Sequence, residues 1–440
     1  MNEENLISHF ISRYSKGNEK VFPYLANRKS KFNPEKDSVY YSGPYWDERE
    51  IHSAIESLMS GFWLSSGEKV DKFERRFSKK FNFEESLMVN SGSSANLVMV
   101  AALKKFYDWQ DGDEVIVSVV GFPTTISPLI QNNLNPVFVD INWNDLNWDL
   151  GKIKALIGPR TRAVFSSPVL GNPGDFDLLV ELCEDAKIHI ISDNCDSLGS
   201  KWKGKFLTDY SVAASCSFYP AHHLTTMEGG MVSSNNPDIV TLARSFSWWG
   251  RGCYCVGRQN LLPEGTCKKR FDKWIPECDD VVDHKYVFEN VGYNLKPLDL
   301  QGAIGIVQLD KYDEIERKRR ANKNRMDLIF GKIPGVRIIK EHEYATTSWF
   351  GAPIVCDSGT LKRSLVSHLE KNRVQTRNYF AGNLLMQPAY KKYGNWMDFP
   401  NASKVLSKVF FVGVSPTISE DMLNYVESVV KSFKPLFSTN

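Results

Sequence analysis

Residues 86–141 read SLMVNSGSSANLVMVAALKKFYDWQDGDEVIVSVVGFPTTISPLIQNNLNPVFVDI. Short runs that are apolar throughout alternate here with stretches of helical periodicity. Further apolar runs follow at 162–169, 189–196 and 212–219. Strands without a polar face, alternating with helices, are typical of a mostly parallel sheet covered by helices. The sequence therefore predicts an α/β fold, with ligands bound where the carboxyl ends of the strands meet loops and helix starts.

The rest of the chain divides around this region. Residues 1–45 combine an amphipathic stretch with polar, Pro-containing chain and are expected to form an N-terminal arm. Residues 46–310 form the large ligand-binding α/β domain, with a less regular, cysteine-containing insert near 245–280. Residues 311–440 alternate strands and helices again, which predicts a smaller C-terminal α+β domain.

Composition excludes several classes of protein. The 440 residues are 42% hydrophobic and 24% charged, an ordinary mix for a globular chain. The net charge is +2, from 54 basic and 52 acidic residues, so we expect no nucleic-acid and no membrane partner. The start MNEENLISHF is unlike a signal peptide, and no run of about 18 apolar residues exists, which favours a cytoplasmic protein. Eight cysteines are too few for a disulfide scaffold.

Polar and aromatic residues follow several predicted strands. The turn that contains Gly92, Ser93 and Ser94 opens a helix, so it is either an anion site or an ordinary N-cap. Asp193 ends an apolar strand, where its carboxylate caps a helix or holds a protonated ring nitrogen of a cofactor. Phe122 ends another strand and either stacks on a flat cofactor or belongs to the core.

The segment 217–230, SFYPAHHLTTMEGG, decides between these alternatives. It resembles the lysine-bearing loop of sugar aminotransferases of fold-type I, which use pyridoxal phosphate. Residues 90–96, Phe122, Asp193 and 292–294 match that family in the same order, and the resemblance covers most of the chain. It implies an aminotransferase-like fold whose cofactor site includes Ser217 and Tyr219. It also implies that Asn294 reaches the cofactor of a neighbouring subunit, in a homodimer with shared sites.

His222 stands where the family has its Schiff-base lysine. Imidazole cannot form that bond, so the cofactor would stay noncovalent, in its amine form. A histidine with a pKa of about 6.5 is suited to general-base catalysis. The alternative is a structural histidine in an inactive site. We expect His223 to have a packing or secondary role.

This exchange of histidine for lysine resembles the nucleotide-sugar 3-dehydratases. The resemblance implies that pyridoxamine 5′-phosphate condenses with the C4 ketone of a nucleotide-diphosphate 4-keto-6-deoxyhexose. The histidine then takes a proton from the C4′ carbon of the cofactor, and the C3 hydroxyl leaves. Asp196 stands where the transaminases commonly have Gln or His, and with Tyr219 it is expected to tune the site. Ser66 and Arg377 lie in segments that resemble sugar-nucleotide contacts, although Arg377 is nearly as readily explained as an ordinary surface arginine.

Four cysteines carry a second resemblance. Cys195, Cys253, Cys255 and Cys267 resemble the [2Fe–2S] pattern of the CDP-4-keto-6-deoxyglucose 3-dehydratases, including those of lipopolysaccharide biosynthesis. The last spacing is longer than in the better-known pattern, so Cys278 is an alternative fourth ligand. Thiolates suit iron–sulfur clusters or zinc, and the remaining explanation is four unrelated buried thiols. Cys183, Cys216 and Cys356 lie in apolar runs and are expected in the core.

Cys195 follows Asp193 by two residues, which is about 7 Å of extended chain. The cluster would therefore lie beside the cofactor. There it would pass electrons to the cofactor–substrate adduct, giving a 3,6-dideoxy-4-ketohexose. The resemblance implies that the electrons come from a separate flavin-dependent NAD(P)H reductase and that the sugar is CDP-linked. Three alternatives stay open: a cluster-free, glutamate-dependent 3-dehydratase, a catalytically dead binding protein, and a conventional aminotransferase with its lysine elsewhere.

Overall fold

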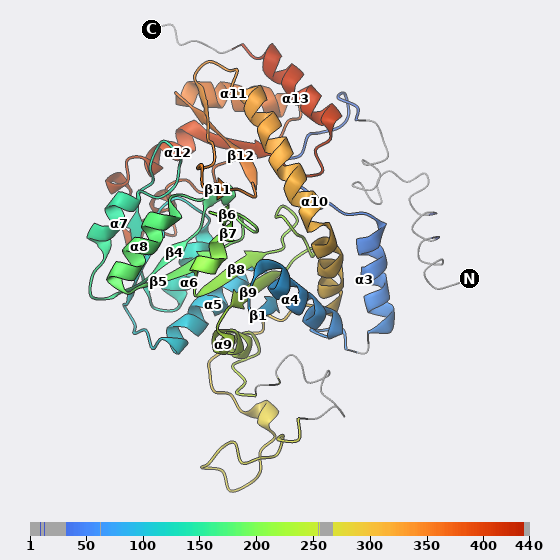
Figure 1. Ribbon diagram of the computed structural model, residues 1–440, viewed down its shortest axis with the longest axis vertical. Helices are drawn as coiled ribbons and strands as arrows, with labels where there is room; N and C mark the ends of the chain where they lie inside the picture. The colour runs from blue at the N-terminus through green and yellow to red at the C-terminus, as the bar shows by residue number, and fades with distance from the viewer. Residues whose placement is uncertain are drawn as a thin grey trace.

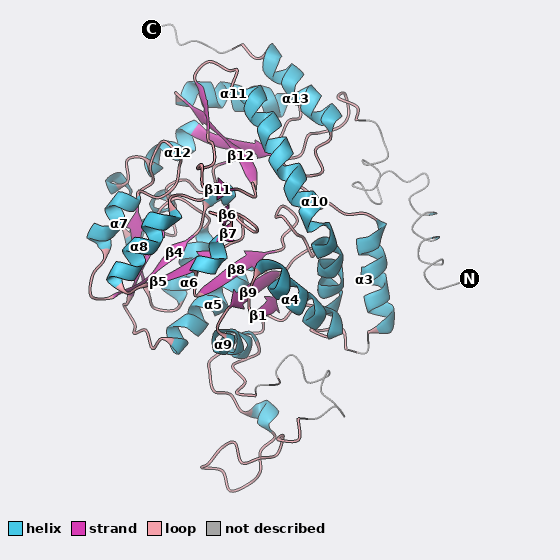
Figure 2. Ribbon diagram, viewed as in Figure 1, coloured by secondary structure: helices cyan, strands magenta, loops and turns pink. Residues whose placement is uncertain are grey.

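The computed structural model of the chain describes residues 9, 13, 32–61, 63–253, 255 and 267–434. A seven-stranded sheet lies in the large part of the molecule, in the order β1-β9-β8-β5-β4-β2-β3 (Figures 1 and 2). Its strands are β1 (Glu85–Val89), β2 (Glu114–Ser118), β3 (Asn135–Val139), β4 (Thr161–Ser166), β5 (His189–Asp193), β8 (Ala213–Ser217) and β9 (Gly230–Ser234). The predicted α/β fold is confirmed.

Within this sheet β9 alone runs against the other strands. It pairs antiparallel with both β1 and β8, whereas the remaining pairs are parallel. Ser217 at the end of β8 is paired with Gly230 at the start of β9. The loop 218–229 therefore leaves and re-enters the sheet at the same edge, which keeps the predicted catalytic loop at the carboxyl ends of the parallel strands.

Successive residues of the strands enter different hydrophobic clusters, because side chains alternate between the faces of a sheet. Val115 and Val117 pack with α5 (Gly92–Phe106), α6 (Pro123–Gln131) and α9 (Pro237–Ser247). Ile116 between them packs with α7 (Leu150–Leu156) and α8 (Phe176–Ala186). α4 (Glu68–Phe81) covers β1, and its phenylalanines form a further cluster with Phe218. Both faces of the sheet are thus buried.

The smaller part is built on a four-stranded antiparallel sheet, in the order β10-β12-β14-β13. Its strands are β10 (Val336–Ile338), β12 (Gly351–Cys356), β13 (Thr376–Asn378) and β14 (Val409–Gly413), and its helices are α11 (Gly359–Lys371), α12 (Ala402–Lys408) and α13 (Glu420–Ser432). A minor sheet, β11 (Ala345–Thr346), β6 (Lys201–Trp202) and β7 (Lys205–Phe206), joins the two parts. This is the α+β unit that the sequence predicted.

Helix α10 (Asp299–Phe330) runs from the large part into the small part (Figure 1). It contacts α4 and α3 (Glu48–Ser60) along one portion, and β12 and α13 along another. The domain boundary expected at residue 310 falls inside this helix. The division of the chain at residue 310 therefore stays a prediction, and α10 continues across that position.

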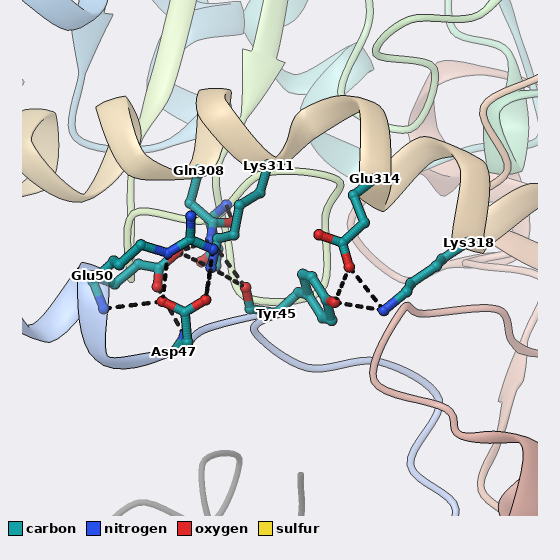
Figure 3. A network of polar contacts seen from close by, with 9 residues as sticks. Tyr45, Asp47, Glu50, Gln308, Lys311, Glu314 and Lys318 are labelled. Atoms are coloured by element: carbon teal, nitrogen blue, oxygen red, sulfur yellow. Dashed lines mark hydrogen bonds and ion pairs between the residues drawn. The ribbon is translucent and has the colours of Figure 1, made fainter. Parts of the chain in front are cut away.

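A polar network fastens the segment before α3 to α10 (Figure 3). The ammonium group of Lys311, which is 2% exposed, pairs with the fully buried carboxylate of Glu50 and donates to the backbone oxygen of Tyr45 at 2.9 Å. Gln308 donates to Glu50 at 2.6 Å, and Lys318 donates to the Tyr45 hydroxyl at 2.6 Å. Each buried charge thus has a partner, as burial requires.

The predicted arm lies largely outside the described residues, and its described end packs on the small part. Val39 donates its backbone N–H to Arg373 and accepts from Gln375, both at 2.9 Å. The described residues between Trp248 and Leu298 contain no strand, and Figure 1 shows this segment leaving the large sheet below α9. None of the described helices is both long and apolar enough to cross a membrane.

Candidate active site

A cavity of about 780 Å³ lies at the carboxyl ends of the parallel strands. Asp193 enters it from the end of β5, Ser217 from the end of β8, and Gly92 from the first turn of α5. Arg377 and Phe380 of the small part close it from the other side. Most of the predicted site residues therefore meet in one place, where the strand topology predicted a ligand site.

Asp193 is buried at the base of this cavity and is held in a fixed orientation. Its Oδ2 accepts from the Asn96 amide at 2.8 Å and from the Thr125 hydroxyl at 2.6 Å. Asn96 is itself fixed by the Ser215 hydroxyl, which donates to it at 2.6 Å. The backbone N–H of Cys195 donates to Asp193 Oδ1 at 3.2 Å. A buried carboxylate aimed into a cavity fits a protonated ring nitrogen of a ligand.

The first turn of α5 forms the neighbouring wall. The Ser91 hydroxyl caps the helix by accepting from the Ser94 backbone N–H at 3.1 Å, so the N–H groups of Gly92 and Ser93 have no partner within the helix. A Cβ at Gly92 would lie 2.4 Å from the Cβ of Ser217, which explains why glycine stands there. The N-terminus of a helix beside a hydroxyl is suited to a phosphate group.

His222 lies on the wall of the cavity, and its Nδ1 is 3.7 Å from Asp196 Oδ1. This nitrogen is buried and makes no hydrogen bond. Burial, together with the positive charge of Arg319, lowers the pKa of His222 to about 3. The imidazole is therefore neutral near pH 7, which is the form that accepts a proton.

The adjacent His223 has a different environment. It is buried, does not line the cavity, and its Nε2 lies 2.8 Å from the backbone oxygen of Ser348. The structure thus separates the two histidines, and the packing or secondary role expected for His223 is consistent with its burial away from the cavity.

Asp196 faces His222, and the pKa of its carboxyl group is also shifted. Burial, followed by the nearby charge of Asp193, raises its pKa to about 7, while the Leu170 N–H donates to its Oδ2 at 3.2 Å. Burial thus favours the neutral forms of both Asp196 and His222. Neighbouring residues with strongly shifted pKa values in a cavity mark a candidate functional site.

Two aromatic side chains project into the cavity. Phe122 is 53% exposed although it stands at the start of α6, and Tyr219 is 47% exposed beside His222. A large apolar ring left open in a concave site fits stacking on a flat ligand. The prediction that Phe122 belongs to the site rather than to the core is therefore consistent with its position.

Sequence reasoning missed Arg319 of α10. This fully buried guanidinium donates to the backbone oxygens of Ala221 (3.2 Å) and His222 (2.9 Å). It also donates to those of Trp349 (3.3 Å) and Phe350 (3.2 Å). It stands in the charged run ERKRRANKN, which reads as a solvated helix face, so no sequence signal distinguished it.

Of the residues predicted to contact the substrate or a second subunit, only Arg377 lines the cavity. Arg377 lines the cavity and lies 4.1 Å above the ring of Tyr41. Ser66 does not line the cavity of its own chain; it is buried, with its N–H donating to Pro297 at 3.2 Å. Asn294 is exposed, also away from that cavity, and accepts from Lys296. The roles expected of Ser66 at the substrate and of Asn294 in a neighbouring subunit stay predictions.

None of the described residues that line the cavity is a lysine. The carboxylate of Asp193, the N-terminus of α5 and the open ring of Phe122 nevertheless fit a flat, phosphorylated pyridine. The residues present therefore fit a pyridoxal phosphate-type cofactor, whereas the amine form bound without a covalent link stays a prediction.

The cysteines are divided between two places. Cys253, Cys255 and Cys267 cluster with Trp248, whereas Cys195 lines the cavity beside Asp193. In the described ranges, three candidate ligands, Cys253, Cys255 and His284, lie with their ligand atoms within 4.8 Å of one another. Cys267, Cys195 and Cys278 do not belong to this group, although Cys267 Sγ lies 3.8 Å from His284 Nε2. The single chain therefore does not assemble the predicted four-thiol set, because β5 carries Cys195 into the cavity wall. Cys183, Cys216 and Cys356 are buried in hydrophobic clusters, as predicted.

Known proteins match this chain over most of its length. It is 36% identical over 401 residues to a dTDP-4-dehydro-2,6-dideoxy-D-glucose 3-dehydratase of Saccharopolyspora spinosa, covering 89% of this chain and 86% of that protein. It is 32% identical over 444 residues to the lipopolysaccharide biosynthesis protein RfbH of Salmonella typhimurium, covering 99% and 98%. A solved E. coli GDP-4-keto-6-deoxy-D-mannose-3-dehydratase with bound hydrated pyridoxal phosphate is 30% identical, with a TM-score of 0.78 over 89% of this chain and 99% of that one.

The family comparison agrees with the fold, the order of the motifs and the cavity. Residues 44–431 match one family continuously, from the end of the predicted arm to the last helix. The chain belongs to the DegT/DnrJ/EryC1/StrS aminotransferase family.

Proposed function

We propose that this protein removes the C3 hydroxyl of a nucleotide-linked 4-keto-6-deoxyhexose, using noncovalently bound pyridoxamine phosphate, in 3,6-dideoxyhexose biosynthesis. The observation that carries the proposal is that His222 lies on the wall of the cavity, with no lysine among the described residues that line it. Relatives named as nucleotide-sugar 3-dehydratases support it. Their names contain dTDP and GDP, and CDP is our proposal for this chain.

Each side chain has a stated task under this proposal. Asp193 holds the ring nitrogen of the cofactor, Phe122 stacks on the ring, and the N-terminus of α5 with Ser217 binds the phosphate. When bound, pyridoxamine phosphate supplies an amine for the C4 ketone and acts as an electron sink. His222 accepts the proton from the C4′ carbon of the cofactor. Arg377, at the cavity opening toward the small part, binds the diphosphate of the substrate.

The reaction also needs a reductant. The C3–O bond breaks, the hydroxyl leaves as water, and C3 gains a hydrogen, which consumes two electrons and two protons. NAD(P)H supplies both electrons and one proton through a separate flavin-dependent reductase, and solvent supplies the second proton. We propose that a [2Fe–2S] cluster bound through Cys253, Cys255 and Cys267 passes the electrons one at a time. Thiolates are suitable ligands for a soft metal, and the three cysteine side chains pack together beside Trp248.

The direct test is anaerobic incubation of the full chain with pyridoxamine phosphate, reductase and NADPH. The protein is incubated separately with CDP-, dTDP- and GDP-linked 4-keto-6-deoxyhexoses. The masses of the products are then measured by mass spectrometry. We expect the CDP sugar to lose one oxygen. Turnover by iron-free protein with glutamate and without reductase would instead identify the cluster-free dehydratase.

His222→Asn tests the role of the histidine. We expect the variant to bind pyridoxamine phosphate like the wild type, because Asp193 and α5 are intact, and to lose about 10²–10⁴-fold in turnover. His52→Asn, on α3 and away from the cavity lining, is the control. Solvent exchange at C4′ that persists in His222→Asn would contradict the assignment.

A homodimer is part of the same proposal. Four well-exposed apolar side chains line one hollow together with Lys296, which donates to Asn294: Trp63 (54%), Leu64 (50%), Trp249 (39%) and Leu298 (49%). Such a patch favours an interface. Light scattering of the purified chain should give twice the mass of 50.1 kDa, and a monomer would leave Ser66 and Asn294 without the predicted role.

A further inference from the structure

His223, the sequence neighbour of the proposed base His222, makes a hydrogen bond that leaves its own loop. Its side chain is 3% exposed, and its Nε2 lies 2.8 Å from the backbone oxygen of Ser348. Because a carbonyl oxygen only accepts, Nε2 carries the hydrogen and Nδ1 carries none. Ser348 is fully buried in the connection between β11 and β12. The imidazole therefore ties the loop of His222 to the segment that leads into β12.

Further buried hydrogen bonds lead from Ser348 to the carboxyl group that faces the proposed base. The backbone N–H of Ser348 donates to the Ser200 hydroxyl at 2.9 Å. That hydroxyl donates to the backbone oxygen of Gly171 at 2.8 Å. Next along the chain, the N–H of Leu170 donates to Asp196 Oδ2 at 3.2 Å. The loop that carries the histidines and the segment that carries Asp196 are thus held by one set of connected hydrogen bonds.

The backbone around these hydrogen bonds leaves little room for movement. A Cβ at Gly171, where φ is +86°, would lie 2.6 Å from the backbone oxygen of Ser348 and 2.5 Å from that of Asp196. Glycine is needed where three segments approach so closely with this backbone conformation. The oxygen to which His223 donates is therefore packed against the segment of Asp196, so a shift of one must displace the other.

The ring of His223 is suited to a fixed hydrogen bond rather than to proton transfer. Its Nδ1 makes no hydrogen bond with any described residue, and the ring does not line the cavity. Burial, followed by the positive charge of Arg319, holds the pKa of His223 well below its ordinary value of 6.5. The imidazole is therefore a neutral donor near pH 7, and its only printed partner is the oxygen of Ser348.

We propose that His223 is a positioning residue for His222. Its bond to Ser348 fixes the loop against the Asp196 segment and so sets where the neighbouring imidazole lies in the cavity. The contact that it maintains is the 3.7 Å approach of His222 Nδ1 to Asp196 Oδ1. This inference rests on the proposed function, in which His222 is the base. A displaced base still permits substrate to bind but removes a proton more slowly.

The test compares two substitutions of His223 that differ in reach. A glutamine side chain places its amide nitrogen near the position of Nε2, whereas asparagine reaches only about as far as Nδ1. We expect His223→Gln to keep kcat within about twofold of the wild type, and His223→Asn to lower kcat about tenfold with KM unchanged. An equal loss in both variants would mean that the hydrogen bond is not the cause.

His368 provides the matched control. Its Nε2 also lies beside a backbone oxygen, that of Val429 at 2.9 Å, and it does not line the cavity. His368→Asn therefore removes the same kind of hydrogen bond elsewhere and should change neither kcat nor KM. A tenfold fall in kcat for this control would show that any such loss slows the enzyme, which would overturn the specific role of His223.

Ser200→Ala tests whether the hydrogen bonds act together, because it removes the hydroxyl between Ser348 and Gly171. We expect kcat to fall about threefold. The double variant His223→Asn/Ser200→Ala should lose little more than His223→Asn alone, since the same connection is already broken. Losses that multiply in the double variant would mean that the two residues act independently.

A measurement that does not depend on turnover separates this inference from the proposed function. In the full chain with isotope-labelled histidine, the nuclear magnetic resonance signal of the His222 ring at one fixed pH should move in His223→Asn and stay in place in His223→Gln. Binding of pyridoxamine phosphate by each variant reports that the large part is folded. A His222 signal that does not move in His223→Asn would overturn the positioning role, even in an active dehydratase. A signal that moves as expected in protein without dehydratase activity would support the positioning role and remove the proposed function.

Discussion

Two buried polar regions of this molecule are organised in opposite ways. The network between Tyr45 and Lys318 pairs each of its buried charges, as in the Glu50–Lys311 ion pair (Figure 3). The wall of the cavity instead holds His222 and Asp196, whose pKa values are shifted toward their neutral forms, and the Nδ1 of His222 lacks a hydrogen bond. The first arrangement fixes chain segments. The second keeps groups ready to exchange protons and costs stability to maintain.

The largest expected effect is on the paired region. Lys311→Met leaves the carboxylate of Glu50 buried without its cation, which should lower the free energy of unfolding by about 3–5 kcal/mol. Lys318→Met, which removes a half-exposed lysine on the same helix, should cost less than about 1 kcal/mol. Urea unfolding of the full chain measures both. Equal losses would erase the distinction between a buried pair and its exposed neighbour.

Asp196→Asn should instead raise the free energy of unfolding. In the unfolded chain Asp196 ionises above its ordinary pKa of 3.8, whereas in the folded chain it keeps its proton until about pH 7. Rising pH between these values therefore favours unfolding of the wild type through this group. The stability of the variant relative to the wild type should grow from near zero at pH 4 by up to about 4 kcal/mol at pH 8.

The matched control for this change is Asp313→Asn, because the Asp313 side chain is 87% exposed. Loss of this exposed carboxylate should change the free energy of unfolding by less than about 1 kcal/mol. A difference for Asp196→Asn that stays constant across the range would mean that the carboxyl is ionised in the folded protein.

His222 should make the free energy of unfolding depend on pH in the opposite direction to Asp196. Its unfolded form binds a proton below its ordinary pKa of 6.5, and its folded form only below about pH 3, so falling pH favours unfolding. His222→Asn should remove up to about 1.4 kcal/mol per pH unit from the pH dependence in this range. In the wild type the two slopes oppose each other. Steeper acid destabilisation in the variant than in the wild type would contradict this.

The smallest effect concerns position rather than charge. Arg319→Lys keeps a cation but cannot reach the four backbone oxygens that Arg319 bridges, so His222 should lose its fixed orientation. We expect a fall of about tenfold in kcat with KM unchanged. Nuclear magnetic resonance titration of His222 should show a changed pKa. Arg320→Lys, whose side chain is about one-third exposed, is the control and should change neither quantity.

Much of the fold followed from the sequence because local pattern and topology agree. The apolar runs around Val117 and Ile191 can be buried only as strands covered on both faces, and the order of motifs placed Asp193, Ser217 and Gly92 at one edge. What the sequence could not provide was the direction of β9. An apolar strand looks the same whether it runs with or against its neighbours.

The remaining differences come from residues whose role depends on distant partners. Arg319 acts through backbone oxygens far away in sequence, and His284 lies 17 residues beyond Cys267 with no motif between them. Conversely, Cys195 has a family-like spacing but is carried elsewhere by β5. Spacing along the chain indicates what residues can do, and only the fold decides which of them meet.

Helix α10 has a consequence for how the cavity can open and close. Over its 32 residues, about 48 Å, it holds Tyr45 through Lys311, the His222 loop through Arg319, and the ring of Trp349, which lies 4.1 Å below Lys323. The small domain cannot swing as a rigid body without bending this helix or detaching Arg319. We therefore expect a ligand to reach the cavity past side chains at its rim, such as those of Arg377 and Phe380, rather than by a swing of the small part.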